Sequence, residues 1–239
     1  RQDSIRTHVL DSAWPSTQRV TYGRHQLKPS AASFLASGQF KSTVDLAKHM
    51  SGDELTTIID QIWVDFTNAV NQVEHPWRFP VLGTQGINGP EVRTMVLRSV
   101  NASIREITVQ TDIRSAKLPD LRKDPRIAWH FYDAKSKVQV RAQGRMTVHH
   151  NDQIARDAWL TIPESNKRNY SSIMAPGTPI NNRELGQAVS GSDTDALENF
   201  AVLSTGITSI DWLQLRSEYH QRALFQWTGN DWDSTWTVP

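Results

Sequence analysis

Cysteine is absent from this 239-residue sequence, so disulfide bonds, thiolate metal sites and thiol catalysis are excluded. An excess of either charge is also lacking, because 26 lysines and arginines face 25 aspartates and glutamates. Nucleic acids and anionic membrane surfaces attract clustered basic residues, so neither is a predicted partner. No apolar run reaches the length of a membrane span, and the first residues have no apolar signal-peptide core. The chain is expected to be soluble and cytoplasmic.

Several catalytic motifs are missing as well. The sequence contains no HExxH, GxSxG, GxxxxGK[ST] or GxGxxG pattern. Their absence argues against a zinc protease, an α/β-hydrolase, a P-loop NTPase and a Rossmann dehydrogenase. His149 and His150 are adjacent, so on a strand they point to opposite faces. No metal site is predicted.

The N-terminal region divides into a polar arm and a helix. Residues 1–50 show no persistent period and are predicted to form an extended arm, with a short helix near residues 44–49. Ser51 and Glu54 have the spacing of a capping box, and apolar residues then recur at three- and four-residue intervals. This pattern predicts a helix that begins after Ser51, packs in the core or against a second subunit, and ends before Pro76.

Residues 51–239 are predicted to form a mainly β domain with flanking helices. Runs of β-branched and aromatic residues alternate with short polar turns, which indicates an antiparallel meander or barrel rather than βαβ units. Strands are predicted at residues 79–83, 92–100, 106–111, 126–132, 137–148, 200–204, 210–216, 222–228 and 232–238. A helix at residues 152–160, with Asn151 as its N-cap, and a lid-like loop at residues 164–194 complete the domain.

The segment from Arg93 to Arg98 is the first of three polar segments on which a functional prediction depends. Side chains alternate between the two faces of a strand, so Arg93 and Arg98 point to opposite sides. A solvated strand keeps its charges on one side. At least one of the two guanidinium groups is therefore expected to be buried against an anion or several acceptors.

The second and third segments follow along the same predicted sheet. Thr111-Asp112-Ile113-Arg114-Ser115-Ala116-Lys117 links a strand to a short helix, and hydroxyls, N–H groups and two cations at such a turn can form an anion site. In the run from Val138 to Gly144, Gln139, Arg141 and Gln143 share one face. Each segment alone is more often an ordinary solvated turn or strand end. Their order and spacing together favour a binding site.

These segments resemble the FMN-binding split-barrel family that includes pyridoxamine 5′-phosphate oxidase. The resemblance is carried by HPWR at residues 75–78, RTMVLR at 93–98, TDIRSAK at 111–117, DPRIAWHFYD at 124–133 and VQVRAQG at 138–144. It is closest to a less characterised branch with an Arg-Ser-x-Lys turn. It implies an antiparallel split β-barrel that binds FMN noncovalently, with the flavin at the two-fold interface of a homodimer.

The resemblance also implies which residues bind the cofactor. The strand that lines the flavin corresponds to Arg93, Thr94, Met95, Val96, Leu97 and Arg98. The turn that binds the flavin phosphate corresponds to Thr111, Ser115 and Lys117. Ala116 replaces an arginine of the oxidases, and Arg114 is predicted to substitute for it. Gln139 on the next hairpin, Trp212 and Arg222 complete the predicted flavin contacts, although an isolated Trp212 is as readily a core aromatic. Arg98 is the predicted catalytic residue, because positive charge at the flavin's pyrimidine edge favours reduction.

The substrate-binding positions depart from the oxidase pattern. Glu218-Tyr219-His220 occupies the place of an Arg-x-His motif, and a glutamate has the wrong charge for the arginine's role. Of the positions that correspond to a substrate-phosphate site, Trp159, Pro163 and Lys167, only Lys167 can bind phosphate. The hypothesis is an FMN protein that is not an efficient pyridoxamine 5′-phosphate oxidase.

Three functions remain open from the sequence. The first is an FMN-dependent oxidoreductase that acts on an unidentified small molecule. The second is a flavin carrier or sensor without turnover. The third, a haem-binding relative on the same barrel, is disfavoured because the phosphate turn is present and no histidine stands out as an axial ligand.

Overall fold

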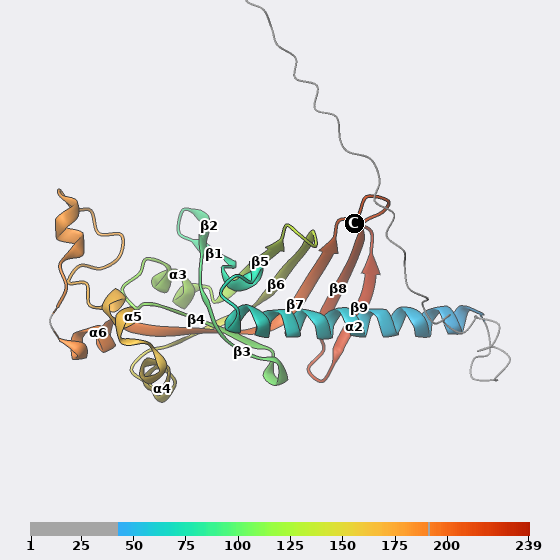
Figure 1. The fold of residues 1–239 in the computed structure, drawn as a ribbon, viewed down its shortest axis with the longest axis horizontal. Helices are drawn as coiled ribbons and strands as arrows, with labels where there is room; N and C mark the ends of the chain where they lie inside the picture. Colours follow the sequence, from blue (N-terminus) through green and yellow to red (C-terminus); the bar gives the residue numbers. More distant parts are fainter. Residues whose placement is uncertain (1–42, 191) are drawn as a thin grey trace, which may run out of the picture. The chain divides into compact units, whose positions relative to one another are not determined.

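The computed structural model describes residues 43–190 and 192–239 (Figure 1). The arm predicted over residues 1–50 lies almost entirely outside these residues, while Lys48–Pro239 form one compact unit. Nine strands make up its sheet: β1 Val81–Gly86, β2 Gly89–Thr94, β3 Leu97–Asn101, β4 Glu106–Asp112, β5 Arg126–Asp133, β6 Val138–His149, β7 Phe200–Gln214, β8 Gln221–Trp227 and β9 Trp232–Thr237.

The helices flank this sheet. The α-helices are α2 Thr43–Asn71, α3 Lys117–Lys123, α4 Gln153–Thr161, α5 Glu164–Lys167 and α6 Asp193–Asn199. The 3₁₀ turns are η1 Pro76–Arg78, η2 Ala102–Ile104, η3 Arg168–Tyr170 and η4 Arg183–Gln187. Among the described helices, none combines the length and the apolar character that crossing a membrane requires.

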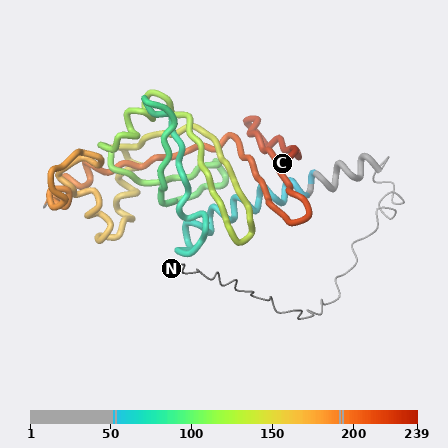
Figure 2. Tube along the Cα trace, turned by 90° about the horizontal axis from the view of Figure 1, so that it is seen from above, coloured from blue at the N-terminus to red at the C-terminus, as the bar shows by residue number. Residues whose placement is uncertain are grey.

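Every strand pair in the sheet is antiparallel, as predicted. The strand order is β2-β1-β5-β6-β7-β4-β3, and β8 pairs with both β7 and β9. One edge of β7 pairs with β6 along nearly its whole length, whereas its other edge pairs first with β4 and then with β8. β7 therefore links the two ends of the sheet, and Figure 2 shows it running from the helices at residues 150–200 toward the β8–β9 hairpin.

Three predicted boundaries were wrong. α2 already begins at Thr43, so the capping-box residues Ser51 and Glu54 lie inside it; propensity differences below about 1 kcal/mol per residue are too small to end a packed helix. Residues 200–214 form one strand rather than two. The single strand predicted over residues 92–100 is divided into β2 and β3, because the first half pairs with β1 and the second with β4.

Helix α4 also begins differently from the prediction. Its N-cap is Asp152, whose carboxylate accepts the Ala155 N–H at 2.9 Å. Asn151 instead has a left-handed φ of 57°. Asparagine tolerates that conformation better than most residues, so it serves the turn that precedes the helix.

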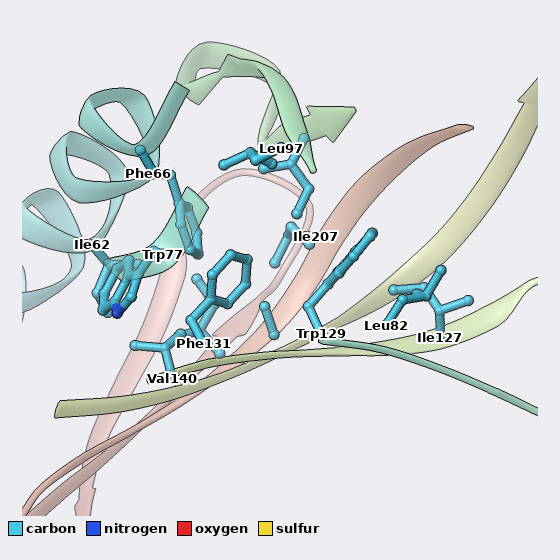
Figure 3. Close-up of a cluster of buried hydrophobic side chains, with 14 of the residues drawn as sticks. Ile62, Phe66, Trp77, Leu82, Leu97, Ile127, Trp129, Phe131, Val140 and Ile207 are labelled. Atoms are coloured by element: carbon cyan, nitrogen blue, oxygen red, sulfur yellow. The ribbon is translucent and has the colours of Figure 1, made fainter. Parts of the chain in front are cut away.

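The main core lies between α2 and the sheet (Figure 3). Phe66 of α2 is fully buried, with its ring centroid 4.6 Å from that of Phe131 and 5.5 Å from that of Trp77. Ile62, one turn earlier, faces the same cluster. The apolar face of α2 is thus core, as predicted. α2 ends at Asn71, before the proline that was predicted to end it, and Trp77 follows in η1, so the HPWR segment positions one of the central core aromatics.

A second, smaller core lies under α4. Trp159, Tyr170 and Phe200 pack together there, with ring centroids 5.0 to 5.9 Å apart. Because Phe200 begins β7 and pairs with Asp112 at the end of β4, this small core supports the turn after β4. It also holds one end of the loop predicted to be lid-like.

Candidate functional site

The turn after β4 gathers hydroxyl groups around one lysine. The Lys117 ammonium, at the start of α3, donates to the Thr111 hydroxyl over 2.8 Å. The Thr111 and Ser115 hydroxyls lie 3.4 Å apart, and both side chains are buried. This follows from the sequence locally, because a strand end, a tight turn and the first helical residue bring positions 111, 115 and 117 together. All three were predicted to bind a phosphate.

Arg93 of β2 stands beside this turn. Its guanidinium donates to Thr84 of β1 at 2.6 Å and pairs with Glu91 at 2.8 Å. Burial lowers the pKa of Lys117, and the positive charge of Arg93 lowers it further. Two cations are thus held close enough to repel each other. We call Arg93, Thr111, Ser115 and Lys117 the Lys117 cluster.

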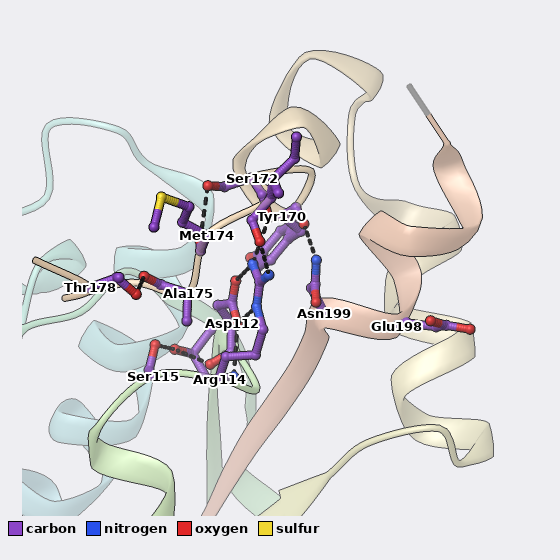
Figure 4. A network of polar contacts seen from close by, with 12 residues as sticks. Asp112, Arg114, Ser115, Tyr170, Ser172, Met174, Ala175, Thr178, Glu198 and Asn199 are labelled. Atoms are coloured by element: carbon purple, nitrogen blue, oxygen red, sulfur yellow. Dashed lines mark hydrogen bonds and ion pairs between the residues drawn. The ribbon is translucent and has the colours of Figure 1, made fainter. Parts of the chain in front are cut away.

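Arg114 does not contribute to this cluster (Figure 4). Its Nε and Nη2 donate to the Asp112 carboxylate at 3.0 and 2.6 Å, and its Nη groups also donate to the carbonyls of Ser172 and Ile173. Four guanidinium N–H bonds are thereby used. The structure does not place Arg114, the predicted substitute for the missing turn arginine, beside Lys117, because Asp112, two residues before it, binds the guanidinium. Arg93 is the second cation of the turn.

Arg98 lies in β3 at an irregularity between Leu97 and Ser99. Its Nε is buried and has no hydrogen-bond partner among the described residues. Burial raises the pKa of the nearby Tyr170 hydroxyl to about 12, an effect that the charge of Arg98 opposes and that of Asp112 reinforces. Arg98 and Asp112 therefore lie within electrostatic range of the same hydroxyl. Arg98 therefore lies near the end of β4, where Asp112 is the last residue of the strand.

The other residues of the RTMVLR segment differ in how deeply they are buried. Met95 and Leu97 are buried in the main core, so only their backbone groups are available to a ligand. Thr94 is exposed and pairs with Val81, and Val96 is half-buried. Arg93 and Arg98 were predicted on opposite faces of one strand but lie in two strands, β2 and β3, and both are half-buried.

Gln139 and Arg222 lie elsewhere on the sheet. Both pair with Leu213 of β7, one from β6 and one from β8, so their side chains share a face. Gln139 is 3.2 Å from the His130 ring, and Arg222 donates to Asp211 at 2.7 and 3.0 Å. These two predicted residues are brought together with each other but not with the Lys117 cluster.

Two residues of this second group were not predicted. Arg141 and Arg222 both bond to the Asp211 carboxylate. Burial opposes ionisation of Asp211, but the hydrogen bonds from the two arginines outweigh it and lower its pKa. The signal for Arg141 was its alternation with Gln139. No local signal marked Asp211, since its partners are 11 and 70 residues away.

Trp212 points to the opposite face from Gln139 and Arg222. It pairs with Val140 and Ala223, both buried, and its ring centroid is 6.4 Å from that of Trp236. Within one chain Trp212 is thus a core aromatic at the edge of the sheet. The prediction that Trp212 and Arg222 contact the same flavin is not supported by a shared surface in this chain.

The two groups of polar residues lie at opposite ends of β7. Thr111 pairs with Ala201, whereas Gln139 pairs with Leu213. These β7 positions are 12 residues apart (213 − 201), or up to roughly 40 Å along a strand at about 3.3 Å per residue. No hydrogen bond or ion pair among the described residues joins the two groups.

Lys167, the one residue predicted to bind a substrate phosphate, already has an acidic partner. Lys167 pairs with Glu164 at 3.0 Å and lies 5.3 Å from the ring centroid of Trp159. Trp159 itself is buried in the second core. Glu218 is exposed in the connection between β7 and β8. None of these residues forms a phosphate site comparable with the Lys117 cluster.

Comparisons with known proteins identify similar sequences and folds. The sequence model described as "Pyridoxamine 5′-phosphate oxidase, FMN-binding domain" matches residues 60–150. The "Pyridoxine/pyridoxamine 5′-phosphate oxidase 2" of Arabidopsis thaliana is 28% identical over 155 residues, which cover 60% of this chain and 76% of that protein. Residues 60–150, which the sequence model matches, contain both the Lys117 cluster and Gln139.

Two solved structures share the fold. A pyridoxamine 5′-phosphate oxidase-related, FMN-binding protein of Nostoc punctiforme PCC 73102 has a TM-score of 0.61 at 23% identity, covering 74% of this chain and 95% of that one. PhzG of Burkholderia lata 383 has a TM-score of 0.60 at 17% identity, covering 77% and 92%. Residues 60–150 of this chain therefore match the FMN-binding domain of pyridoxamine 5′-phosphate oxidase, and the chain has the split β-barrel fold of these two structures.

Proposed function

We propose that this protein binds the FMN phosphate at the Lys117 cluster and is an FMN-dependent oxidoreductase acting on a small molecule. The observation that carries the proposal is the pair of cations, Lys117 and Arg93, beside two buried hydroxyls. Two like charges held together raise the energy of the folded protein, and a bound dianion between them reverses that effect. Lys117 bonds to a hydroxyl rather than to a carboxylate, so its charge is available to a ligand.

Arg98 supports the same assignment. A buried guanidinium N–H without an acceptor costs about 1–3 kcal/mol, and a ligand that supplies the acceptor recovers this energy. The isoalloxazine ring of FMN carries carbonyl and ring-nitrogen acceptors of this kind and, when bound, accepts a hydride or electrons. The chain's own contribution is to hold the phosphate at one end and to place positive charge at Arg98.

The separation of the two polar groups favours a homodimer as part of the proposal. Gln139 and Arg222 lie far from the Lys117 cluster in one chain, but a second copy related by a two-fold axis can present them to the first copy's flavin. The sheet face that carries them also exposes apolar side chains. Val92 is 72% exposed and Tyr132 44% exposed, and a partner subunit would cover both.

The first prediction concerns the identity of the substrate. The purified protein is expected to release FMN, identified by mass, yet to turn over pyridoxamine 5′-phosphate at least about 100-fold more slowly than a typical enzymatic rate of about 10 s⁻¹. The reason is that Lys167 is paired with Glu164 and that Glu218 stands where the oxidases have an arginine.

This prediction is checked by anaerobic mixing with pyridoxamine 5′-phosphate while the flavin absorbance is followed, with dithionite as a control for reducibility. Rapid bleaching by pyridoxamine 5′-phosphate would contradict it. A protein without FMN that also fails to bind added FMN would contradict the proposed function itself. A protein that binds FMN but is reduced by no biological electron donor would be a flavin carrier.

The second prediction concerns Arg98. Replacing Arg98 with Ala should lower the midpoint potential of the bound FMN by about 30–60 mV, the equivalent of one charge-assisted hydrogen bond of about 1.5–3 kcal/mol in a two-electron couple. The dissociation constant of oxidised FMN should rise by a smaller factor than that of reduced FMN, because Arg98 binds the reduced, anionic ring more strongly. Dye-equilibrated reduction and fluorescence titration measure the two quantities.

Arg126→Ala is the matched control for this experiment. Arg126 is an arginine of the same sheet, but it is exposed and pairs with Asp124 at 2.6 Å. It should change neither the potential nor the affinity. Equal rises in the dissociation constants of oxidised and reduced FMN for Arg98→Ala would show that Arg98 only holds the flavin.

A further inference from the structure

A cavity lies beneath α2 at the far end of the sheet from the Lys117 cluster. Its volume is about 350 Å³, and it is bounded by α2, η1, the β5–β6 hairpin and the end of β7. Its chemical character comes from Asp65, His75, Trp77, Asp133 and Trp212. The remaining lining is mostly apolar.

The charged side chains that line this cavity are carboxylates. Asp65 and Asp133 both line it, and no lysine or arginine does. Burial raises the pKa of Asp65, as does the negative charge of Asp133, against a hydrogen bond from Gln61 and the charge of His75. Asp133 is already used by the hairpin, where it accepts the Lys135 and Ser136 N–H groups. Asp65 keeps one carboxylate oxygen without a hydrogen bond to the described residues.

Two tryptophans supply aromatic surface to the same cavity. Trp77 is 3% exposed, and its indole Nε1 is buried without a hydrogen-bond partner among the described residues. A buried donor of this kind is costly unless a ligand or ordered water accepts it. Trp212 is nearly as buried and contributes a second indole. Tryptophan faces attract cations more strongly than any other side-chain ring.

The remaining polar group is His75. Its Nδ1 accepts the Trp77 backbone N–H at 3.2 Å, so in the neutral ring the proton is on Nε2. His75 therefore completes the HPWR turn through one nitrogen and leaves the other as a donor. Among the described residues no group of three His, Cys, Asp or Glu side chains is arranged to hold a metal ion, so the carboxylates of this cavity are not part of a metal centre.

We propose that this cavity binds a small organic cation, a protonated amine on an aromatic or aliphatic body. The amine lies against the free oxygen of Asp65 and the body lies between the indoles of Trp77 and Trp212. The site is separate from the flavin-phosphate site, since two carboxylates repel a phosphate and Trp212 points away from the face of Gln139 and Arg222. The proposal does not depend on the proposed oxidoreductase activity.

Calorimetric titration of the full-length, FMN-loaded protein with benzylamine tests this proposal, with benzyl alcohol as the neutral ligand of the same shape. Benzylamine should bind at least about 10-fold more tightly than benzyl alcohol, because only the amine carries the charge that the cavity complements. Asp65→Asn, which keeps the side chain's size, should remove most of that preference and leave benzyl alcohol binding unchanged.

Asp60→Asn is the matched control, since Asp60 is an exposed aspartate of the same helix outside the cavity. It should retain the full preference for benzylamine. Equal binding of the two ligands to the unaltered protein would overturn the proposal without any variant. So would a preference that Asp65→Asn leaves intact, or one that Asp60→Asn reduces equally. Loss of FMN from the protein would bear only on the oxidoreductase proposal.

Discussion

Lys117→Ala is expected to weaken FMN binding about 10- to 100-fold and to leave riboflavin binding within about 2-fold of the unaltered protein. The two flavins differ only in the phosphate. The Lys117 ammonium lies 2.8 Å from the Thr111 hydroxyl and shares its surroundings with Arg93. A hydrogen bond from a charged donor to an anion contributes about 1.5–3 kcal/mol, which corresponds to this range of affinity. Titration of flavin fluorescence measures both constants under identical conditions.

Lys123→Ala provides the comparison within the same helix. Lys123 is exposed in the last turn of α3 and should affect neither flavin. An equal loss of FMN and riboflavin affinity in Lys117→Ala would mean that Lys117 supports the turn rather than the phosphate. Unchanged FMN affinity would mean that the phosphate binds elsewhere, and the Lys117 cluster would then lose its assignment.

Gly144→Ala is expected to destabilise the protein by about 3 kcal/mol or more, the upper end of the usual cost of overpacking. Gly144 lies in β6 beside the irregularity at Gln143, where β6 meets Gly206 of β7. A Cβ atom at Gly144 would lie 2.2 Å from the Gly206 carbonyl oxygen. That neighbour is backbone within the sheet, so it cannot rotate away. For a domain of this size the loss corresponds to a fall in Tm of roughly 10 °C.

Gly206→Ala is the matched control, because the Gly206 carbonyl crowds a Cβ atom at Gly144 while the Cβ position of Gly206 itself is open. A Cβ atom at Gly206 meets nothing within 4 Å, so the change should alter stability by no more than about 0.5 kcal/mol. Thermal unfolding followed by circular dichroism, with saturating FMN in every sample, compares the three proteins. Similar melting temperatures for the two variants would show that β6 and β7 can separate locally at little cost.

The local features of the site could be predicted from the sequence. Thr111, Ser115 and Lys117 are close in the chain, and the strand–turn–helix pattern that joins them brings their side chains together whatever surrounds them. The separation of Arg93 from Arg98 was not a matter of alternation along one strand, because the two residues lie in β2 and β3, which pair with different strands. The apolar face of α2, by contrast, was predictable from its helical period.

Boundaries and long-range partners were decided by the tertiary structure. The sequence predicts a break between residues 204 and 210, yet β7 continues through it because β6 pairs with β7 from Val202 to Gln214. Arg114 has a local acceptor in Asp112, but its guanidinium is also held by carbonyls 58 and 59 residues away. Neither relationship leaves a periodic signal in the sequence.

The sequence by itself determined the chemistry of the turn and the antiparallel character of the sheet, because both depend on residues that are neighbours in the chain. Only the tertiary structure decided that Arg93 rather than Arg114 accompanies Lys117, and that Gln139 and Arg222 lie at the other end of β7. It also placed Trp212 with Asp65 at one cavity. The physical reason is that periodicity specifies which face a side chain occupies, whereas strand order and register specify what it meets there.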